Sequence, residues 1–170
     1  MATSESEIET MSKVLRGDRS AYQDILARNF PKLLSLCEAY TRDSAMARAA
    51  VVEATSLGMR RAAVFDGRVP FLAWMGDYSI EECRRKLGRD LSNAISDKIA
   101  TEDHESVVHH MAALAMNKAD DLQQRMAKKH LRGCTRCAEE MQRVQQAVAG
   151  MKPMESVAFE DVWQEIETRL

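Results

Sequence analysis

The sequence of 170 residues has little of what builds sheets and long loops. Aromatic residues make up 5% of it, there are only seven glycines and three prolines, and runs of β-branched residues are missing. Strands are enriched in β-branched and aromatic residues. Ala, Met, Leu, Glu, Lys and Arg are abundant instead, and all of them are good helix formers. The composition therefore predicts an all-α protein.

The chain also lacks a strong charge of one sign. Its 24 basic and 26 acidic residues give a net charge of −2, which argues against a basic field over the whole molecule that attracts nucleic acid. Residues 1–90 hold 14 bases and 13 acids (+1), and residues 91–170 hold 10 bases and 13 acids (−3). With 45% apolar and 29% charged residues, the composition is typical of a globular protein.

Long hydrophobic runs are missing as well. Residues 1–10 are polar and acidic, unlike the basic start and apolar run of a signal peptide. No stretch approaches the roughly twenty apolar residues that cross a bilayer. We therefore expect a cytoplasmic protein with no membrane partner. Thiols stay reduced in that compartment, so neighbouring cysteines there indicate a metal or redox site rather than a disulfide.

Apolar spacing predicts helices throughout the chain. In the first part we expect them at about 6–15, 19–29, from Pro31 onward, from Ser44 to near Phe65, and from Pro70 to near Arg89, with Asp18 and Asp43 as N-caps. In the second part we expect them at about 102–116, 119–131, 135–151 and 156–170.

A polar segment divides these helices into two groups. We predict one small helical domain over residues 1–90, a linker over 91–101, a second helical domain over 102–151, and a linker with a last helix over 152–170. The boundary rests on the composition change at 91–101, which ends in the capping sequence Thr101-Glu102-Asp103.

The most informative stretch is His130-Leu-Arg-Gly-Cys134-Thr-Arg-Cys137. Gly133 lets the backbone turn, so His130 and Cys134 can reach one point, and Cys137 follows on the first turn of the next helix, whose N-terminus favours a thiolate. A structural zinc ion takes four tetrahedral nitrogen and sulfur ligands. Three are present here. From the residues alone, the fourth is open among His104, His109 and His110, the remaining histidines.

A His-x3-Cys-x2-Cys pattern after a helical hairpin resembles the zinc-binding anti-sigma domain of bacteria. The resemblance covers about residues 102–170. In that family the first ligand lies about 25 residues before the motif histidine, and His104 lies 26 before His130. The resemblance thus implies Zn²⁺ as cofactor, held by His104, His130, Cys134 and Cys137. It also implies that the last helix packs against the sigma factor that is being held.

The last helix has the apolar stripe needed for such docking. Five residues at 3–4 spacing form it, namely Phe159, Val162, Trp163, Ile166 and Leu170. Acidic residues crowd the other side. A helix this short is marginal alone in water, so its stripe must be buried. We expect it to dock on a sigma-type domain, either of this chain or of a partner, rather than on its own zinc domain.

The first domain resembles region 2 of extracytoplasmic-function sigma factors. The matching pieces are Gly17 to Tyr22, Phe65 to Trp74, and the pair Arg84-Arg85. Two surfaces that are functional in the family have different residues in this chain. Where an Ala-Glu-Asp run and a following Gln grip RNA polymerase, this chain has Ala47, Arg48, Ala49 and Val52. Where an Ala-Arg-Asn run approaches promoter DNA, it has Ser79, Ile80 and Glu81, and the carboxylate of Glu81 repels phosphate.

A basic cluster follows at the end of that domain, formed by Arg84, Arg85, Lys86 and Arg89. It is a candidate contact for nucleic acid or for an acidic partner. The alternative is a solvated helix end whose cations compensate the helix dipole.

Together these patterns predict a regulator of bacterial transcription that acts by protein–protein interaction and not as an enzyme. Its expected partner is a sigma factor, an anti-sigma factor or RNA polymerase. One alternative is a DNA-binding, sigma-like transcription factor. Another is a thiol redox protein using Cys134 and Cys137, although such a motif normally lies beside a βαβ pattern, which is not visible. The oligomeric state is left open.

Overall fold

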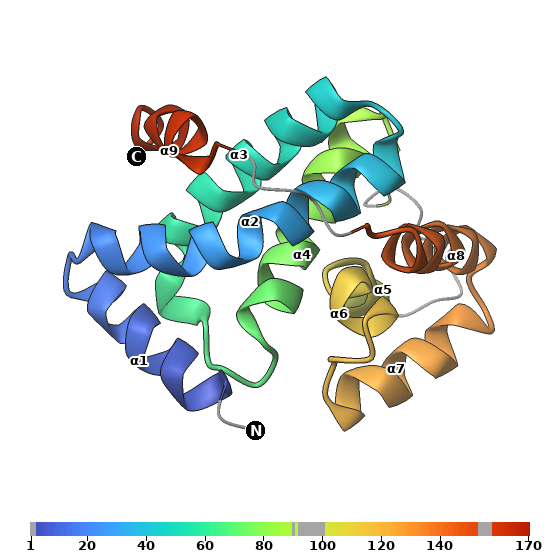
Figure 1. Cartoon of the computed structure of the whole chain (residues 1–170). Coiled ribbons are helices and arrows are strands. Elements are labelled where there is room, and N and C mark those ends of the chain that lie inside the picture. Colours follow the sequence, from blue (N-terminus) through green and yellow to red (C-terminus); the bar gives the residue numbers. More distant parts are fainter. Residues whose placement is uncertain (1–2, 90, 92–100, 153–157) are drawn as a thin grey trace.

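A computed structural model of the chain describes residues 3–89, 91, 101–152 and 158–170 (Figure 1). These described residues form nine α-helices and one 3₁₀ turn, and they contain no β-strand. The all-α prediction is therefore confirmed. Within the described part of the chain, no helix combines the length and apolar character needed to cross a membrane.

Four helices and the 3₁₀ turn make up the first half of the molecule. They are α1 (Thr3–Leu15), α2 (Arg19–Thr41), α3 (Ser44–Arg60), η1 (Ala62–Val64) and α4 (Phe71–Lys86). Both predicted N-caps are present. The Asp18 carboxylate accepts a hydrogen bond from the Ala21 amide at 3.1 Å, and the Asp43 carboxylate accepts one from the Met46 amide at 2.9 Å. These bonds satisfy amides that the first turn of a helix leaves without an intrahelical partner.

Helix α2 corrects the sequence prediction, because it runs unbroken through Pro31 where two separate helices were expected. An internal proline costs about 3 kcal/mol relative to alanine. Phe30 and Leu33, on either side of it, are fully buried, and each such side chain contributes about 1.5–3 kcal/mol on burial. Tertiary packing along the helix therefore outweighs the local preference for a break.

The second half contains α5 (Thr101–Val108), α6 (Met111–Ala115), α7 (Asp121–Leu131) and α8 (Thr135–Ala149). One helix was predicted over 102–116, but it breaks at His109 and His110. The first half supplies partners for both new ends. Arg84 donates to the Val108 carbonyl at 3.1 Å, and the Asp77 carboxylate accepts from the Ala113 amide at 3.0 Å.

The two halves share one continuous hydrophobic core, in which α8 packs against α2 and α6 packs against α4 (Figure 1). Polar contacts cross the same boundary. The Tyr40 hydroxyl donates to the buried Glu140 carboxylate, and the Ser35 hydroxyl oxygen accepts from the Lys152 amide at 2.8 Å. The predicted linker 91–101 lies mostly outside the described residues, so the proposed domain boundaries stay a prediction.

The last helix, α9 (Phe159–Glu167), lies against α3 and α2 of the first half, away from α5–α8 (Figure 1). The Trp163 ring centroid lies 6.4 Å from that of Tyr22, and Phe159 lies 5.5 Å from Phe30. Of the apolar stripe, Val162, Trp163 and Ile166 are buried, and Phe159 and Leu170 are partly buried. In this structure the stripe is therefore covered by the chain's own first half.

Candidate metal centre

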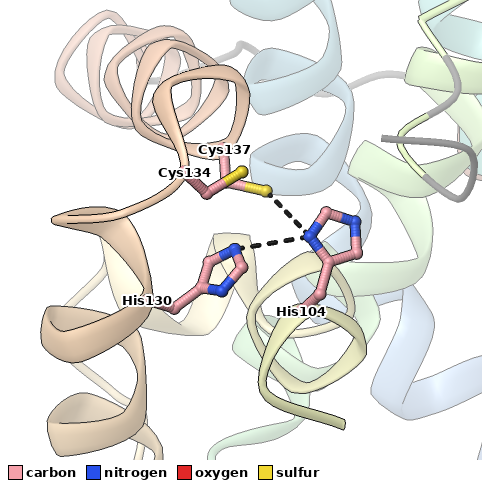
Figure 2. A group of neighbouring side chains, drawn as sticks. All are labelled: His104, His130, Cys134 and Cys137. Atoms are coloured by element: carbon pink, nitrogen blue, oxygen red, sulfur yellow. Dashed lines mark hydrogen bonds between the residues drawn. The ribbon is translucent and has the colours of Figure 1, made fainter. Parts of the chain in front are cut away.

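Four buried side chains from three helices meet beneath the turn between α7 and α8 (Figure 2). His104 comes from α5 and His130 from the last turn of α7, while Cys134 is the N-cap residue of α8 and Cys137 lies in its first turn. Their ligand atoms all lie within 4.8 Å of one another. Two nitrogens and two sulfurs in such a group can hold a metal ion.

The distances within the group match a tetrahedral site. Zinc–nitrogen bonds of about 2.05 Å and zinc–sulfur bonds of about 2.3 Å give tetrahedral edges of about 3.3 Å between nitrogens and about 3.6 Å between nitrogen and sulfur. His104 Nδ1 lies 3.3 Å from His130 Nε2 and 3.5 Å from Cys137 Sγ (Figure 2). The separations of His104 Nδ1 from His130 Nε2 and from Cys137 Sγ therefore match those that a shared tetrahedral ion requires, and Cys134 Sγ lies within 4.8 Å of all three atoms.

The orientation of the His104 ring also suits a ligand. Its Nε2 lies 2.9 Å from the backbone carbonyl oxygen of Leu91. A carbonyl oxygen only accepts, so Nε2 carries the hydrogen and Nδ1 of the neutral ring presents a lone pair toward His130 and Cys137. Metal-binding histidines are commonly oriented in this way through their second nitrogen. Leu91 is thus a supporting residue that side-chain patterns did not predict, because it acts through its backbone.

Burial controls the electrostatics of the cysteine pair. Burial first, and then the neighbouring Cys134 thiol, raise the pKa of the Cys137 thiol to about 12, while the cations Arg84 and Arg136 act in the opposite direction. The sequence predicted that the helix N-terminus favours a thiolate here, but desolvation outweighs that effect. Cys137 is therefore a thiol at neutral pH unless a cation binds, and metal binding at this position displaces the proton.

The other two histidines lie outside the cluster and face acids of α4. His109 Nδ1 lies 3.3 Å from a Glu81 carboxylate oxygen, which raises the pKa of His109. His110 Nδ1 lies 3.5 Å from an Asp77 carboxylate oxygen. Among the three candidates for the fourth ligand, the structure brings only His104 to His130 and the two cysteines.

The residues of the predicted basic cluster at the end of α4 contact other groups of the same chain. Arg84 is buried, which contradicts its expected place on an exposed cationic surface, because it bonds to the carbonyl of Val108 in the second half. Arg85 pairs with Glu53 and Glu82, and Lys86 Nζ lies 2.8 Å from Glu53. The Arg89 guanidinium lies 6.0 Å from the centre of the Tyr40 ring. Neighbouring acids thus weaken this surface as a phosphate contact.

We compared the chain with known proteins. No model of a protein family matches it, and neither a curated protein nor a solved structure does. The resemblances to anti-sigma and sigma domains therefore stay predictions that rest on the residues quoted above.

Proposed function

We propose that this chain is a regulator of bacterial transcription that acts by binding other proteins, with a zinc ion in the His104, His130, Cys134 and Cys137 site. Zinc fits the ligand set because thiolates and imidazoles are its preferred ligands and four of them leave no open position. A closed site of this kind has a structural role. Two thiolates and two neutral imidazoles balance the charge of Zn²⁺, so the buried site is neutral when it is loaded.

The observation that carries the proposal is the position of α9. The anti-sigma resemblance implies that the last helix holds a sigma factor, and here α9 lies on α2 and α3 of the half that resembles sigma region 2. Trp163 and Ile166 are buried in that contact. In this proposal the chain contains both members of a sigma and anti-sigma pair, with one docked on the other.

One departure from the sigma family supports the same interpretation. Arg48 stands where the family shows an acidic residue that grips RNA polymerase. In this chain the Arg48 guanidinium lies 3.3 Å from the carboxylate of Glu165 on α9. A basic residue at position 48 therefore fits the acidic α9 of the same chain. The acidic residue that the family has at this position would repel α9. The surface that binds polymerase in the family serves α9 in this proposal.

The expected partner competes either for α9 or for the surface of α2 and α3 that α9 covers. A sigma factor whose region 2 offers a similar surface would take α9, whereas an anti-sigma factor would place its own last helix on α2 and α3. RNA polymerase is the third expected partner, through the same α3 surface. In each case the partner must displace α9 from the first half.

The test is a capture of partners from the native cell by the full chain, followed by transcription with purified components. Baits are the unchanged chain, Trp163→Ala, which weakens α9 docking, and Thr168→Ala, an exposed change on the same segment, as the control. We expect a sigma factor, an anti-sigma factor or polymerase among the captured proteins. Binding should fall with Trp163→Ala for a sigma factor and rise for an anti-sigma factor, with Thr168→Ala unchanged.

The captured protein is then added to promoter-dependent transcription by core polymerase. The chain should change the amount of transcript in proportion to its concentration. It should start no transcript when it is the only sigma-like protein present. Capture that Trp163→Ala does not change, together with no effect on transcription, would contradict the proposed function.

A further inference from the structure

The second half carries a basic surface that the proposed function does not use. Residues 122–138 contain five cations and no acidic residue, the cations being Arg125, Lys128, Lys129, Arg132 and Arg136. The whole chain has a net charge of −2, so the remaining residues together carry −7, which is −2 minus +5. This segment is therefore a local positive pole on an otherwise acidic protein.

Helix geometry gathers four of these cations on one side of α7. At 100° per residue, positions 125, 128, 129 and 132 fall within an arc of about 100°. The opposite side of α7 carries Ala127 and His130, which are buried against the rest of the second half. All five cations are exposed. We call the surface formed by Arg125, Lys128, Lys129 and Arg132 the α7 basic face, and Arg136 follows in the first turn of α8.

Most of the cations of this face have no acidic partner among the described residues. Within the described part of the chain, Arg125, Lys128, Arg132 and Arg136 form no ion pair. The adjacent metal site contributes no net charge when two thiolates and two neutral imidazoles hold a divalent ion. The α4 cations differ, because Arg85 and Lys86 each lie against Glu53.

We propose that the α7 basic face binds the phosphate backbone of nucleic acid, without reading its sequence. Binding to phosphates is dominated by electrostatics and needs cations more than apolar anchors. A protein partner would need buried aromatic or aliphatic anchors at the interface centre, and a membrane would need a broad apolar helix face. Among the described residues, Leu122 is the only large apolar side chain exposed beside the cations, so the face fits phosphate best.

This binding site is separate from the internal contact of α9. Figure 1 shows α7 and α9 at opposite ends of the molecule. Nucleic acid on α7 therefore does not obstruct the displacement of α9 from α2 and α3 by a protein partner. The proposal goes beyond regulation by protein binding and does not depend on it.

The test measures binding of the full, metal-loaded chain to a short labelled DNA duplex of mixed sequence, by fluorescence anisotropy over a salt titration. The variant combines Arg125→Gln, Lys128→Gln and Arg132→Gln. The matched control combines Arg16→Gln, Arg19→Gln and Arg28→Gln, three exposed cations of the first half, and therefore removes the same charge. A double variant, Arg125→Gln with Lys128→Gln, leaves Arg132 unchanged, because Arg132 lies in the turn that carries Cys134.

We expect the triple variant to bind on the order of ten-fold more weakly or worse. Its logarithmic salt slope should fall by about 3, because each phosphate that the protein no longer neutralises lowers the slope by about 0.9. The double variant should lower the slope by about 2 on the same basis. The matched control should change little. Circular dichroism and bound zinc establish that the variants remain folded.

Three results would overturn the proposal. The first is an absence of DNA binding by the unchanged chain at low salt. The second is an equal loss of binding in the variant and the matched control, which would reflect net charge alone. The third is tighter binding of polyglutamate than of the duplex with the same dependence on the α7 cations, which would make the face a docking site for an acidic protein.

Discussion

The two halves of the molecule are stabilised in different ways. Among the described residues, most of the large, fully buried side chains lie in the first half, including Tyr22, Phe30 and Phe71, whereas α5–α8 contribute only Met111 to that group. Apart from Met141, the other buried apolar side chains of α5–α8 are small or medium-sized, and alanines are frequent among them. A small helical unit with so little apolar burial needs a metal, a disulfide or a neighbouring surface for stability. The second half has a candidate metal site and the surface of the first half.

Loss of metal should therefore affect the halves unequally, and this is the largest effect we expect. Structural zinc contributes on the order of 10 kcal/mol in small zinc domains. Cys134→Ser and His104→Ala should each lower bound zinc from about one per chain to near zero and unfold α5–α8, while α2–α4 persist. Elemental analysis measures the bound zinc, and hydrogen exchange measures the unfolding of α5–α8.

Cys83→Ser is the control for the metal experiment, because Cys83 is buried in the first half, outside the candidate site. It should keep its zinc. Full zinc occupancy in Cys134→Ser would refute the ligand assignment. Loss of zinc in His109→Ala but not in His104→Ala would refute the choice of the fourth ligand.

Removal of the Trp163 side chain, which anchors α9, should destabilise the first half and leave the metal site of the second half intact. Trp163 is buried against the first half, so Trp163→Ala should lower the free energy of unfolding by about 3–5 kcal/mol. Chemical denaturation measures the loss. Zinc content should stay full, because α9 contributes no ligand. A loss of zinc in this variant would show that α9 supports the second half after all.

The contact between the halves can be weakened at one hydrogen bond. Tyr40→Phe removes the donor to Glu140, whose side chain is only 1% exposed and whose other bond comes from Arg143 at 3.1 Å. A buried carboxylate that loses a partner costs about 1–3 kcal/mol. Denaturation should show this loss. Tyr78→Phe is the control, because its hydroxyl makes no hydrogen bond within the described residues, and an equal effect of both changes would contradict the assigned role of Tyr40.

The smallest effect is expected at the exposed ion pair of α9. The side chains of Arg48 and Glu165 are 40% and 37% exposed, so Arg48→Gln should cost at most about 1 kcal/mol, and less at high salt. Arg48→Glu restores the acidic character of the sigma family and should weaken α9 docking further by like-charge repulsion. Protease sensitivity of the α9 segment, compared at low and high salt, measures this. An effect that salt does not change would contradict an electrostatic role.

Short-range features of this protein could be predicted from its sequence. Asp18 and Asp43 cap the helices that follow them, and a cap involves only the next three residues. The spacing of His130, Cys134 and Cys137 predicted their approach for the same reason, since one turn joins them. The apolar stripe of α9 also follows from helical period alone. Choice of His104 as the fourth candidate ligand required a family resemblance, because no local rule spans 26 residues.

What the sequence determined by itself was therefore the helical class, the helix starts capped by Asp18 and Asp43, and the local part of the candidate metal site. The tertiary structure decided that α2 continues through Pro31, that a break separates α5 from α6, that Arg84 is buried, and that α9 covers its own first half. Each of these depends on partners far away in the chain. Their packing and desolvation energies are as large as local propensities or larger, and the local pattern does not encode them.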